Sequence, residues 1–439
     1  MTQRITRRSA LKTAAAGLAA PLFVRNYATA APVETLRHVS VGASGMAWSD
    51  ISSLTKASKH VKIVAVADVD DNRTADVRKA FPDAKVYADW REMFEKEQFD
   101  TVNVSCPDHM HAAPMMRAIR MGKHVYGQKP LTQTVYEARK LTEAAAAKKA
   151  VTQMGIQVHS AAEHRSVVAT IQSGAIGKVK AVHSWSGKDW GDNKPKPTRT
   201  DPVPANLHWD LWLGVAADRP FIGNGYYHPG NWRKRLDFGT GTFGDMGCHI
   251  LDPVFGSLGV GNPTSVTSVG DAPVDVSWGL NCQVEFVFPG TQFTTDPVSL
   301  TWYNGDRRPP ESVARLVAPH KLPSQGSIYI GTDGVMFSPY IGMPILLPAD
   351  KYAGHKLPNP GGKNHYLEWV EAVRGNGTTS APFSYAGPLT EMVLLGCLAT
   401  RFPNVSLTWD PKRMKVTNHE EANRFVRRER RKGWEEEGL

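Results

Sequence analysis

The 439-residue sequence predicts a two-domain α/β protein. A doubly wound domain with a parallel sheet precedes an α+β domain with a large, mostly antiparallel open sheet. Three observations predict this fold. Short apolar runs alternate with helical stretches as far as residue 157, and β-rich runs dominate between Ser265 and Phe337. A composition that is 41% hydrophobic and 21% charged also supplies enough apolar residues for two cores.

Residues 1–30 have the features of an export signal. Arg7 and Arg8 precede an uncharged stretch, Thr13–Val24, and Ala28-Thr29-Ala30 resembles a cleavage site. The uncharged stretch is too short for a membrane span, which needs roughly 20 residues. The pattern resembles a twin-arginine (Tat) signal, with Ala10 where Phe is usual. It predicts export by the Tat machinery to the periplasm or beyond, without a stable membrane anchor.

Residues 31–157 are expected to form a Rossmann domain that binds a dinucleotide. The predicted strand Leu36–Val41 ends in Gly42-Ala43-Ser44-Gly45-Met46-Ala47, and a helical stretch follows. Small residues there let the backbone approach a pyrophosphate at the helix N-terminus. In the Gly-x-Gly-x-x-Gly pattern, Ser44 and Ala47 stand in place of the second and third glycines. The expected cofactor contacts are Gly42, Ser44, Gly45 and Met46.

The second predicted strand, Val61–Ala67, is continuously apolar and ends in Asp68, 26 residues after Gly42. A carboxylate at this position accepts hydrogen bonds from the adenosine ribose and repels a 2′-phosphate. Asp68 therefore favours NAD over NADP.

The alternation then continues to the end of this domain. The expected elements are helix Thr74–Phe81, strand Val86-Tyr87, helix Trp90–Lys96, strand Thr101–Ser105, helix Ala112–Met121 and strand Lys123–Tyr126. Ligands of open α/β sheets bind outside the carboxyl ends of the strands. Cofactor contacts are therefore expected from Ser105, Pro107, His109 and His111 in one turn, and from Gln128 and Lys129 after the last strand.

The substrate domain is expected to span residues 158–400. Asp245 and His249 are four residues apart, so a helix would place them on one face, and a carboxylate beside an imidazole can orient it. Simpler alternatives exist: Asp245 as a helix N-cap, and His249 as a hydrogen-bonded core residue. Asp252 is interpreted as structural. The spacing does not resemble a metalloprotease helix, and no metal site is predicted.

The remainder is expected to contain strands, two helices and a C-terminal extension, residues 401–439. The expected strands are Ser265–Val269, Gly279–Phe288, Gln292–Tyr303 and Gly326–Phe337, and the expected amphipathic helices are His365–Arg374 and Leu389–Arg401. The helices should pack back on the Rossmann domain. The Pro-rich segment Pro195–Pro204 is interpreted as a lid or a subunit arm. Cys106, Cys248, Cys282 and Cys397 match no metal pattern, and we expect free, mostly buried thiols.

The net charge of +10 does not predict nucleic-acid binding. Half of it comes from five basic residues in the first 30 positions, where there is no acidic residue. A second basic run, Arg424–Lys432, precedes Glu435, Glu436 and Glu437 and is interpreted as a solvated tail helix.

Gln128-Lys129-Pro130 after the last strand resembles the Glu-Lys-Pro hallmark of the Gfo/Idh/MocA oxidoreductases. The resemblance covers most of the chain beyond the signal and is strongest with an exported branch that carries Gln-Lys-Pro and Gly-Asp-x-Gly-x-His. The matching stretches are 104–111, 122–131, 153–157, 209–214, 227–233, 238–252 and 385–391.

The resemblance implies an NAD-dependent oxidation of a sugar or glycoside by a homo-oligomer. It implies Lys129, Asp245 and His249 as the catalytic set, and Gln157 as a further cofactor contact. By unperturbed pKa, His249 is the natural base for the hydroxyl proton. Gln128 lacks the negative charge of the usual Glu, so we expect Lys129 to lose its proton more easily than in Glu-Lys-Pro relatives.

Aromatic and polar residues before the predicted helix of His249 fit a sugar. Aromatic faces stack on sugar C–H groups, and Arg, His and Asp bind hydroxyls. Trp209 and Trp212 are at helical spacing and are interpreted as core. The residues expected at the substrate, besides Asp245 and His249, are Tyr227, His228, Trp232 and Arg233.

Three functions remain open. The first is a dehydrogenase that turns over free NAD. The second keeps NAD tightly bound and re-reduces its own product, either as a glycoside hydrolase that passes through a 3-keto intermediate or as a sugar–sugar oxidoreductase. The third is a cofactor- or sugar-binding protein without catalysis. An exported protein favours the second, because a recycled cofactor needs no external pool.

Overall fold

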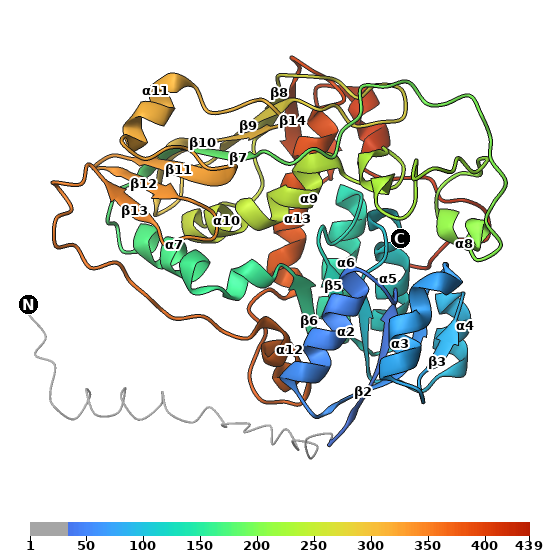
Figure 1. Cartoon of the computed structure of the whole chain (residues 1–439). Helices are drawn as coiled ribbons and strands as arrows, with labels where there is room; N and C mark the ends of the chain where they lie inside the picture. Colours follow the sequence, from blue (N-terminus) through green and yellow to red (C-terminus); the bar gives the residue numbers. More distant parts are fainter. Residues whose placement is uncertain (1–33) are drawn as a thin grey trace, which may run out of the picture. The chain divides into compact units, whose positions relative to one another are not determined.

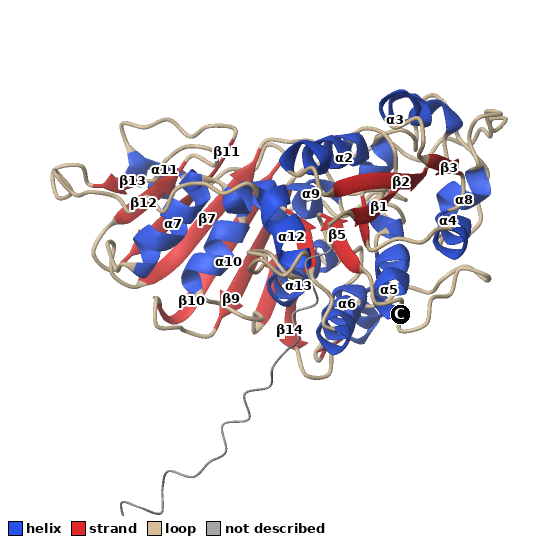
Figure 2. Cartoon of the chain, turned by 90° about the horizontal axis from the view of Figure 1, so that it is seen from below, coloured by secondary structure: helices blue, strands red, loops and turns tan. Residues whose placement is uncertain are grey.

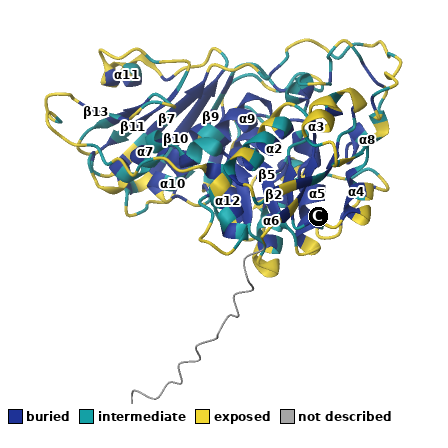
Figure 3. Cartoon of the chain, turned by 60° about the horizontal axis from the view of Figure 1, so that its bottom comes forward, coloured by how far each residue is buried: buried dark blue, intermediate teal, exposed yellow. Residues whose placement is uncertain are grey.

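The computed structural model describes residues 34–439 (Figure 1), so the predicted export signal, residues 1–30, lies outside the described residues. Two sheets organise this unit, a six-stranded sheet in the first part and a nine-stranded sheet in the second. Both sheets are built mainly of buried residues, and exposed residues gather on loops and outer helix faces (Figure 3). The predicted fold class is confirmed.

The six-stranded sheet is parallel throughout and has the strand order β3-β2-β1-β4-β5-β6. This is the doubly wound order of a dinucleotide-binding domain. Its strands are β1 (Leu36–Val41), β2 (Val61–Ala67), β3 (Lys85–Tyr87), β4 (Thr101–Val104), β5 (His124–Gln128) and β6 (Thr152–Gly155). Strand β5 runs two residues beyond the predicted end and includes Gln128, which fixes the position of that side chain.

Helices cover both faces of this sheet. They are α2 (Met46–Ala57), α3 (Ala75–Ala80), α4 (Trp90–Lys96), α5 (Ala112–Arg120) and α6 (Val135–Lys148). Helix α6 begins with a capping box, in which the Thr134 side chain accepts from the Glu137 amide and Glu137 accepts from the Thr134 amide.

The nine-stranded sheet has the order β13-β12-β11-β7-β10-β9-β8-β14-β15, and only the pairing of β7 with β10 is parallel. Its strands are β7 (Val179–Ser186), β8 (Ser265–Ser268), β9 (Cys282–Phe288), β10 (Thr294–Asn304), β11 (Gln325–Gly331), β12 (Val335–Ser338), β13 (Ile345–Leu347), β14 (Ser406–Asp410) and β15 (Lys415–Val416).

This sheet differs from the prediction in three respects. The single strand predicted over Gly326–Phe337 is a hairpin, because the turn residues Thr332-Asp333-Gly334 separate β11 from β12. The central strand β7 was not predicted. In addition, β14 and β15 come from residues 401–439, so part of the expected extension forms one edge of the sheet.

Helices lie over one face of the nine-stranded sheet (Figure 2). The second part contains α7 (Ala162–Gln172), α8 (Trp209–Leu213), α9 (Gly241–Ile250), α10 (Asp252–Leu258), α11 (Glu311–Ala314), α12 (His365–Val373) and α13 (Phe383–Ala399). Helices α12 and α13 pack back on α2 and α6, as predicted. The expectation that both are amphipathic is wrong for α13. That helix starts six residues earlier than predicted and is buried on nearly all sides, because it lies between α6, α9 and the large sheet.

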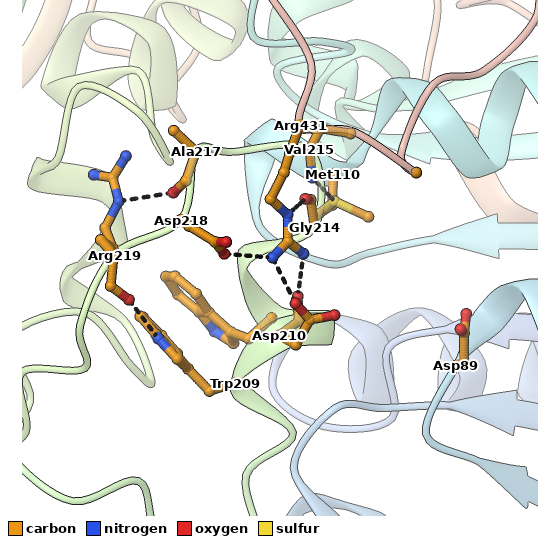
Figure 4. A network of polar contacts seen from close by, with 12 residues as sticks. Asp89, Met110, Trp209, Asp210, Gly214, Val215, Ala217, Asp218, Arg219 and Arg431 are labelled. Atoms are coloured by element: carbon orange, nitrogen blue, oxygen red, sulfur yellow. Dashed lines mark hydrogen bonds and ion pairs between the residues drawn. The ribbon is translucent and has the colours of Figure 1, made fainter.

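The prediction of a solvated tail helix over Arg424–Lys432 is wrong. The segment has only a 3-10 turn at Glu420–Phe425, and its arginines reach back to other elements. Arg431 donates to the carboxylates of Asp210 (2.5 Å) and Asp218 (2.7 Å) and to the Gly214 carbonyl (2.9 Å) (Figure 4). Arg430 pairs with the buried Glu137 at 2.7 Å. These partners lie more than two hundred residues away in sequence, so no local pattern reveals them.

The four cysteines are free and three of them are buried, as predicted. Among residues 34–439, no helix is long and apolar enough to cross a membrane. No group of three or more potential metal-binding side chains gathers among the same residues.

Candidate active site

A crevice of about 250 Å³ opens at the carboxyl edge of the parallel sheet, and residues from both parts of the chain line it. Thirteen predicted site residues are among its walls: Gly42, Ser44, Gly45, Met46, Asp68, Ser105, Pro107, His111, Gln128, Lys129, His228, Trp232 and Arg233. The predicted residues His109, Gln157, Tyr227, Asp245 and His249 are not.

The loop after β1 is shaped for the backbone of a pyrophosphate group. Gly42 has a φ of 103°, and a Cβ there would lie 2.9 Å from both the Ala47 Cβ and the Ser105 carbonyl oxygen. No side chain caps the N-terminus of α2 at Gly45. The first amides of the helix are therefore available to an anionic ligand. The geometry fits a dinucleotide despite Ser44 in place of glycine.

Asp68 follows β2 at the same edge, as predicted. Its carboxylate accepts from the amides of Ala43 (2.9 Å) and Asp70 (3.1 Å), which ties the phosphate loop to the end of β2. Burial raises the pKa of Asp68. Arg73 also lines the crevice, in a 3-10 turn that the Asp70 side chain caps, and it belongs to no motif that could be recognised in the sequence.

Lys129 meets Asp245 across the two parts of the chain. The Lys129 Nζ donates to the Asp245 Oδ1 at 2.7 Å and to the Asp245 carbonyl at 2.9 Å, and both side chains are about nine-tenths buried. Arg233 Nε lies 3.3 Å from the same Oδ1, and Lys188 Nζ lies 3.8 Å from Oδ2. Asp245 is inside α9, whose N-cap is Thr240, so the N-cap alternative is wrong.

Three cations around one carboxylate set the charge state of the site. Burial alone would raise the pKa of Asp245, but Lys129, Arg233 and Lys188 hold it well below its usual range. Burial, and then the charge of Lys129, lower the pKa of His249 to about 3. The Nδ1 of His249 is buried and has no hydrogen-bond partner among the described residues, so His249 is not a hydrogen-bonded core histidine. Its ring is neutral at physiological pH, rather than poised near it as expected.

The carboxylate that Glu-Lys-Pro would place at position 128 is supplied by another residue. Gln128 Nε2 donates to both oxygens of Asp50, at 3.0 and 2.9 Å, and Asp50 also accepts from Ser105 Oγ (2.7 Å) and Tyr366 OH (2.9 Å). Burial raises the pKa of Asp50 to about 6. Asp50 was not predicted, because it lies in the middle of α2 and belongs to no motif.

Three predicted contacts face away from the crevice. His109 is buried against Trp212 and Phe238, and its Nε2 lies 3.1 Å from the Trp212 carbonyl. Tyr227 is buried in the same aromatic cluster. Each is adjacent in sequence to a residue that does line the crevice, Asp108 or His228, and consecutive side chains of a turn point in different directions.

Gln157, the third, donates to Tyr366 OH at 2.9 Å and belongs to the hydrogen-bonded network behind Asp50. His111 lines the crevice and holds two loops together, because its ring nitrogens lie 2.8 Å from the carbonyls of Pro130 and Cys106. Asp252 is buried and pairs with His159 (3.0 Å) and Tyr385 (2.6 Å), as a structural residue would.

A strap crosses from the second part of the chain to the loop after β2. We use this name for residues 206–208 together with His228. Asn206 and His228 donate to Asp70 at 2.6 and 2.8 Å, and the His208 amide donates to the Val69 carbonyl at 2.9 Å. His228 therefore lies beside the expected ribose contact, Asp68. Trp232 and Arg233 remain as candidates for the substrate, with the Arg233 guanidinium 4.2 Å from the Trp232 ring centre.

The fold and the crevice define a two-domain protein with a dinucleotide site at the carboxyl edge of its parallel sheet. Two family models match, the NAD-binding Rossmann fold of an oxidoreductase family over residues 36–156 and the C-terminal α/β domain of the same family over 161–278. Together they cover more than half of the chain. The chain belongs to the Gfo/Idh/MocA oxidoreductase family, and its cofactor is NAD.

Similar proteins include sugar and polyol dehydrogenases. Levoglucosan dehydrogenase of Pseudarthrobacter phenanthrenivorans is 21% identical over 187 residues, 43% of this chain and 40% of that protein. Inositol 2-dehydrogenase of Burkholderia cenocepacia is 30% identical over 151 residues, 34% of this chain and 45% of that protein. The chain thus spans less than half the length of these relatives.

Solved structures share the fold at low identity. The WlbA dehydrogenase of Bordetella pertussis, solved with NADH and UDP-GlcNAcA, has a TM-score of 0.61 at 12% identity, over 86% of this chain and 99% of that one. A levoglucosan dehydrogenase solved with NADH has a TM-score of 0.55 at 14% identity, over 84% and 97% of the two chains.

Proposed function

We propose that the protein oxidises a CH–OH group of a sugar or glycoside. One observation carries this proposal: Lys129 from the Rossmann domain, which lines the NAD crevice, forms a buried ion pair at 2.7 Å with Asp245 from helix α9. Helix α9 also carries His249 one turn after Asp245, and the charge of Lys129 lowers the pKa of that imidazole, which supports His249 as the second polar group beside the ion pair.

Oxidation of a CH–OH group removes a hydride from the carbon and a proton from the hydroxyl group, and different groups accept each. Bound NAD⁺ supplies the acceptor for the hydride from the carbon. Lys129, an ammonium in its pair with Asp245, donates a hydrogen bond to the substrate oxygen and stabilises the carbonyl that forms. His249 is neutral and accepts the hydroxyl proton, and the Asp245 carboxylate stabilises the resulting imidazolium.

The low pKa of His249 favours release of the proton that it accepts from the substrate. A second positive charge beside Lys129 is unfavourable, so the imidazolium of His249 is a strong acid that gives up its proton readily. His249 is partly exposed, which leaves a route for that proton.

A carbohydrate fits the groups around this pair. Arg233 and Lys188 offer donors to hydroxyl groups, and Trp232 contributes an apolar edge to the crevice, with one ring face covered by Arg233. The substrates in the names of the relatives, levoglucosan and inositol, are polyhydroxylated rings, which supports the same class for this chain.

The proposal is tested by supplying NAD⁺ and a panel of sugars, sugar acids and glycosides to the purified protein while NADH formation is followed. At least one sugar should yield NADH. Lys129→Met and His249→Asn should each reduce kcat/KM by about a hundredfold or more, the usual contribution of an acid or base group. The control Lys180→Met alters an exposed strand residue and should leave the rate unchanged. Wild-type rates in both site variants would refute the assignment.

The strap favours a second candidate, a redox-neutral reaction on retained NAD, such as glycoside hydrolysis through a 3-keto intermediate. Hydrogen bonds from Asn206, His208 and His228 hold the strap to the loop that carries Asp68, and we expect them to hinder exchange of a bound dinucleotide. Release of aglycone without added NAD, together with NAD in the native mass spectrum, would support this candidate. NADH formation that depends on added NAD⁺ would exclude it.

We also propose that residues 1–30 direct export through the Tat machinery, and that the exported protein is a homo-oligomer. The paired Arg7 and Arg8 support export. Replacement of both by Lys should retain the protein in the cytoplasm, and cell fractionation measures this. Light scattering of the purified protein tests the oligomer, and a monomeric mass would refute it.

A further inference from the structure

A second cavity, of about 140 Å³, lies between the C-terminal segment and the loop before α9. It shares no lining residue with the NAD crevice. Four of its walls are arginines, Arg401 at the end of α13 and Arg424, Arg427 and Arg428 in the C-terminal segment. We refer to these four residues and the space between them as the arginine cavity.

The four arginines have no carboxylate side chain as a partner. Among residues 34–439, no Asp or Glu side chain forms an ion pair with any of the four, and Arg427 donates to the main-chain oxygen of Leu439 at 3.3 Å. Arg428 has a buried Nε without any hydrogen-bond partner, and its one polar contact is to the side-chain oxygen of Gln133. Arg401 packs its guanidinium on the rings of Trp278 and Phe425, at 5.0 and 4.3 Å.

Two neighbouring arginines, in contrast, do have carboxylate partners. Arg430 and Arg431, two and three residues after Arg428, pair with Glu137, Asp210 and Asp218. The carboxylates nearest the arginine cavity are therefore already engaged. Glu137 is held by Arg430 at 2.7 Å, and Asp237, which lines the cavity, is held by Arg219 at 2.5 Å.

Partly buried cations without counter-charges are unfavourable unless a ligand supplies the charge. Burial lowers the pKa of Arg401 to about 10, so it stays charged at neutral pH. Guanidinium groups present planar pairs of donors that match the oxygen spacing of carboxylates and phosphates.

We propose that the arginine cavity binds a small oxyanion of the phosphate or carboxylate type. The ligand accepts hydrogen bonds from Arg401 and Arg428 in the interior and from Arg424 and Arg427 at the rim. It holds the C-terminal segment against the loop that leads into α9. Thr240, the N-cap of α9, lines this cavity and donates to Asp108 in the wall of the NAD crevice at 2.7 Å, so one hydrogen bond connects the walls of the two cavities.

The test is isothermal titration of the full chain with sodium phosphate and, separately, sodium acetate, at constant ionic strength set with chloride. Saturating NADH is present throughout, because the phosphate loop at α2 would otherwise also bind phosphate. We expect saturable binding at one site. Tighter binding of phosphate identifies a phosphate ligand, and tighter binding of acetate identifies a carboxylate. Absence of saturable binding of both anions overturns the proposal.

The double variant Arg401→Gln/Arg428→Gln should weaken binding by at least about tenfold, the effect of losing one charge-assisted hydrogen bond. Arg413→Gln, an exposed arginine on the turn after β14, should bind as the wild type does. Equal affinity of the double variant and the wild type overturns the proposal. Should the double variant fail to fold, Arg424→Gln replaces it, since this side chain is exposed, and the same comparison decides.

Thermal unfolding in anion-free buffer separates a ligand site from a structural cluster. Removing unpaired cations should not lower the Tm of the double variant by more than a few degrees. Arg430→Gln, which strips Glu137 of its partner, should lower the Tm substantially. A double variant that is as unstable as Arg430→Gln, and that binds phosphate normally, would show that the four arginines serve the fold alone.

Discussion

The buried carboxylate of Asp50 makes the stability of the protein depend on pH in an unusual direction. Burial raises the pKa of Asp50 from 3.8 to about 6. The folded protein therefore binds more protons at this residue than the unfolded chain between about pH 4 and pH 6, and its stability falls as the pH rises through this range. A shift of about two pKa units corresponds to about 3 kcal/mol of unfolding free energy that is present below pH 4 and lost above pH 6.

The variant Asp50→Asn should remove this dependence. Its amide rearranges the hydrogen bonds with Gln128, Ser105 and Tyr366, at a cost that is independent of pH. The difference in unfolding free energy between variant and wild type should therefore change with pH. The variant should gain about 3 kcal/mol relative to the wild type between pH 4 and pH 7. Urea unfolding at several pH values measures this difference.

Two controls make the result specific to Asp50. Asp76→Asn changes an exposed carboxylate on α3, and its effect should not vary in the same way. Tyr366→Phe removes a donor that lowers the pKa of Asp50, so the pH at which stability falls should move above 6. A difference between Asp50→Asn and wild type that stays constant from pH 4 to pH 7, or that shrinks as the pH rises, would refute the reasoning.

Three further predictions concern the site itself. Asp245→Asn leaves Lys129 and Arg233 without a carboxylate and should cost about 3–5 kcal/mol of unfolding free energy, whereas Glu92→Gln, which breaks the exposed pair with Lys96, should cost less than about 1 kcal/mol in the same urea assay. Lys129→Met removes a charge that lowers the pKa of His249, so an NMR titration should show this pKa rising above 3 while burial keeps it below 6.5; an unchanged value would contradict the placement of the two groups. Asp68→Ala should weaken NADH binding and reduce the preference for NADH over NADPH in fluorescence titrations, while Arg73→Ala should weaken NADPH binding alone; an unaltered preference in Asp68→Ala would count against its contact with the ribose.

Where local pattern and tertiary packing agree, the sequence predicts the fold closely. Strands β1 and β2 and helix α4 have the predicted bounds, since an apolar run or an Asp cap defines each of them within a few residues. The predictions fail where distant partners decide. Helix α13 is buried on nearly all sides because two domains enclose it, and the C-terminal arginines are ordered by carboxylates far away in the chain.

The same distinction separates the predicted site residues. Loops whose backbone shape matters, such as Gly42 to Met46, are visible in the sequence, because glycine and small residues are needed there. The orientation of a side chain in a turn is not visible. Asp108 and His228 line the crevice, while their sequence neighbours His109 and Tyr227 pack against aromatic rings. All four side chains carry polar groups, so residue type does not show which of two neighbours faces the crevice.

The surroundings of Gln128 explain why an amide, and not a carboxylate, precedes Lys129. The sequence implies that Lys129 has lost the negative charge of a neighbouring Glu. The structure places the buried carboxylate of Asp50, on helix α2, against the Gln128 amide at the end of strand β5. Because the pKa of Asp50 is about 6, this negative charge is present at neutral pH and absent in mild acid. A Glu at position 128 would then lie beside a second carboxylate, and the two could not both ionise without cost. The neutral Gln128 amide donates hydrogen bonds to the buried Asp50 carboxylate, whereas a Glu at position 128 would repel it.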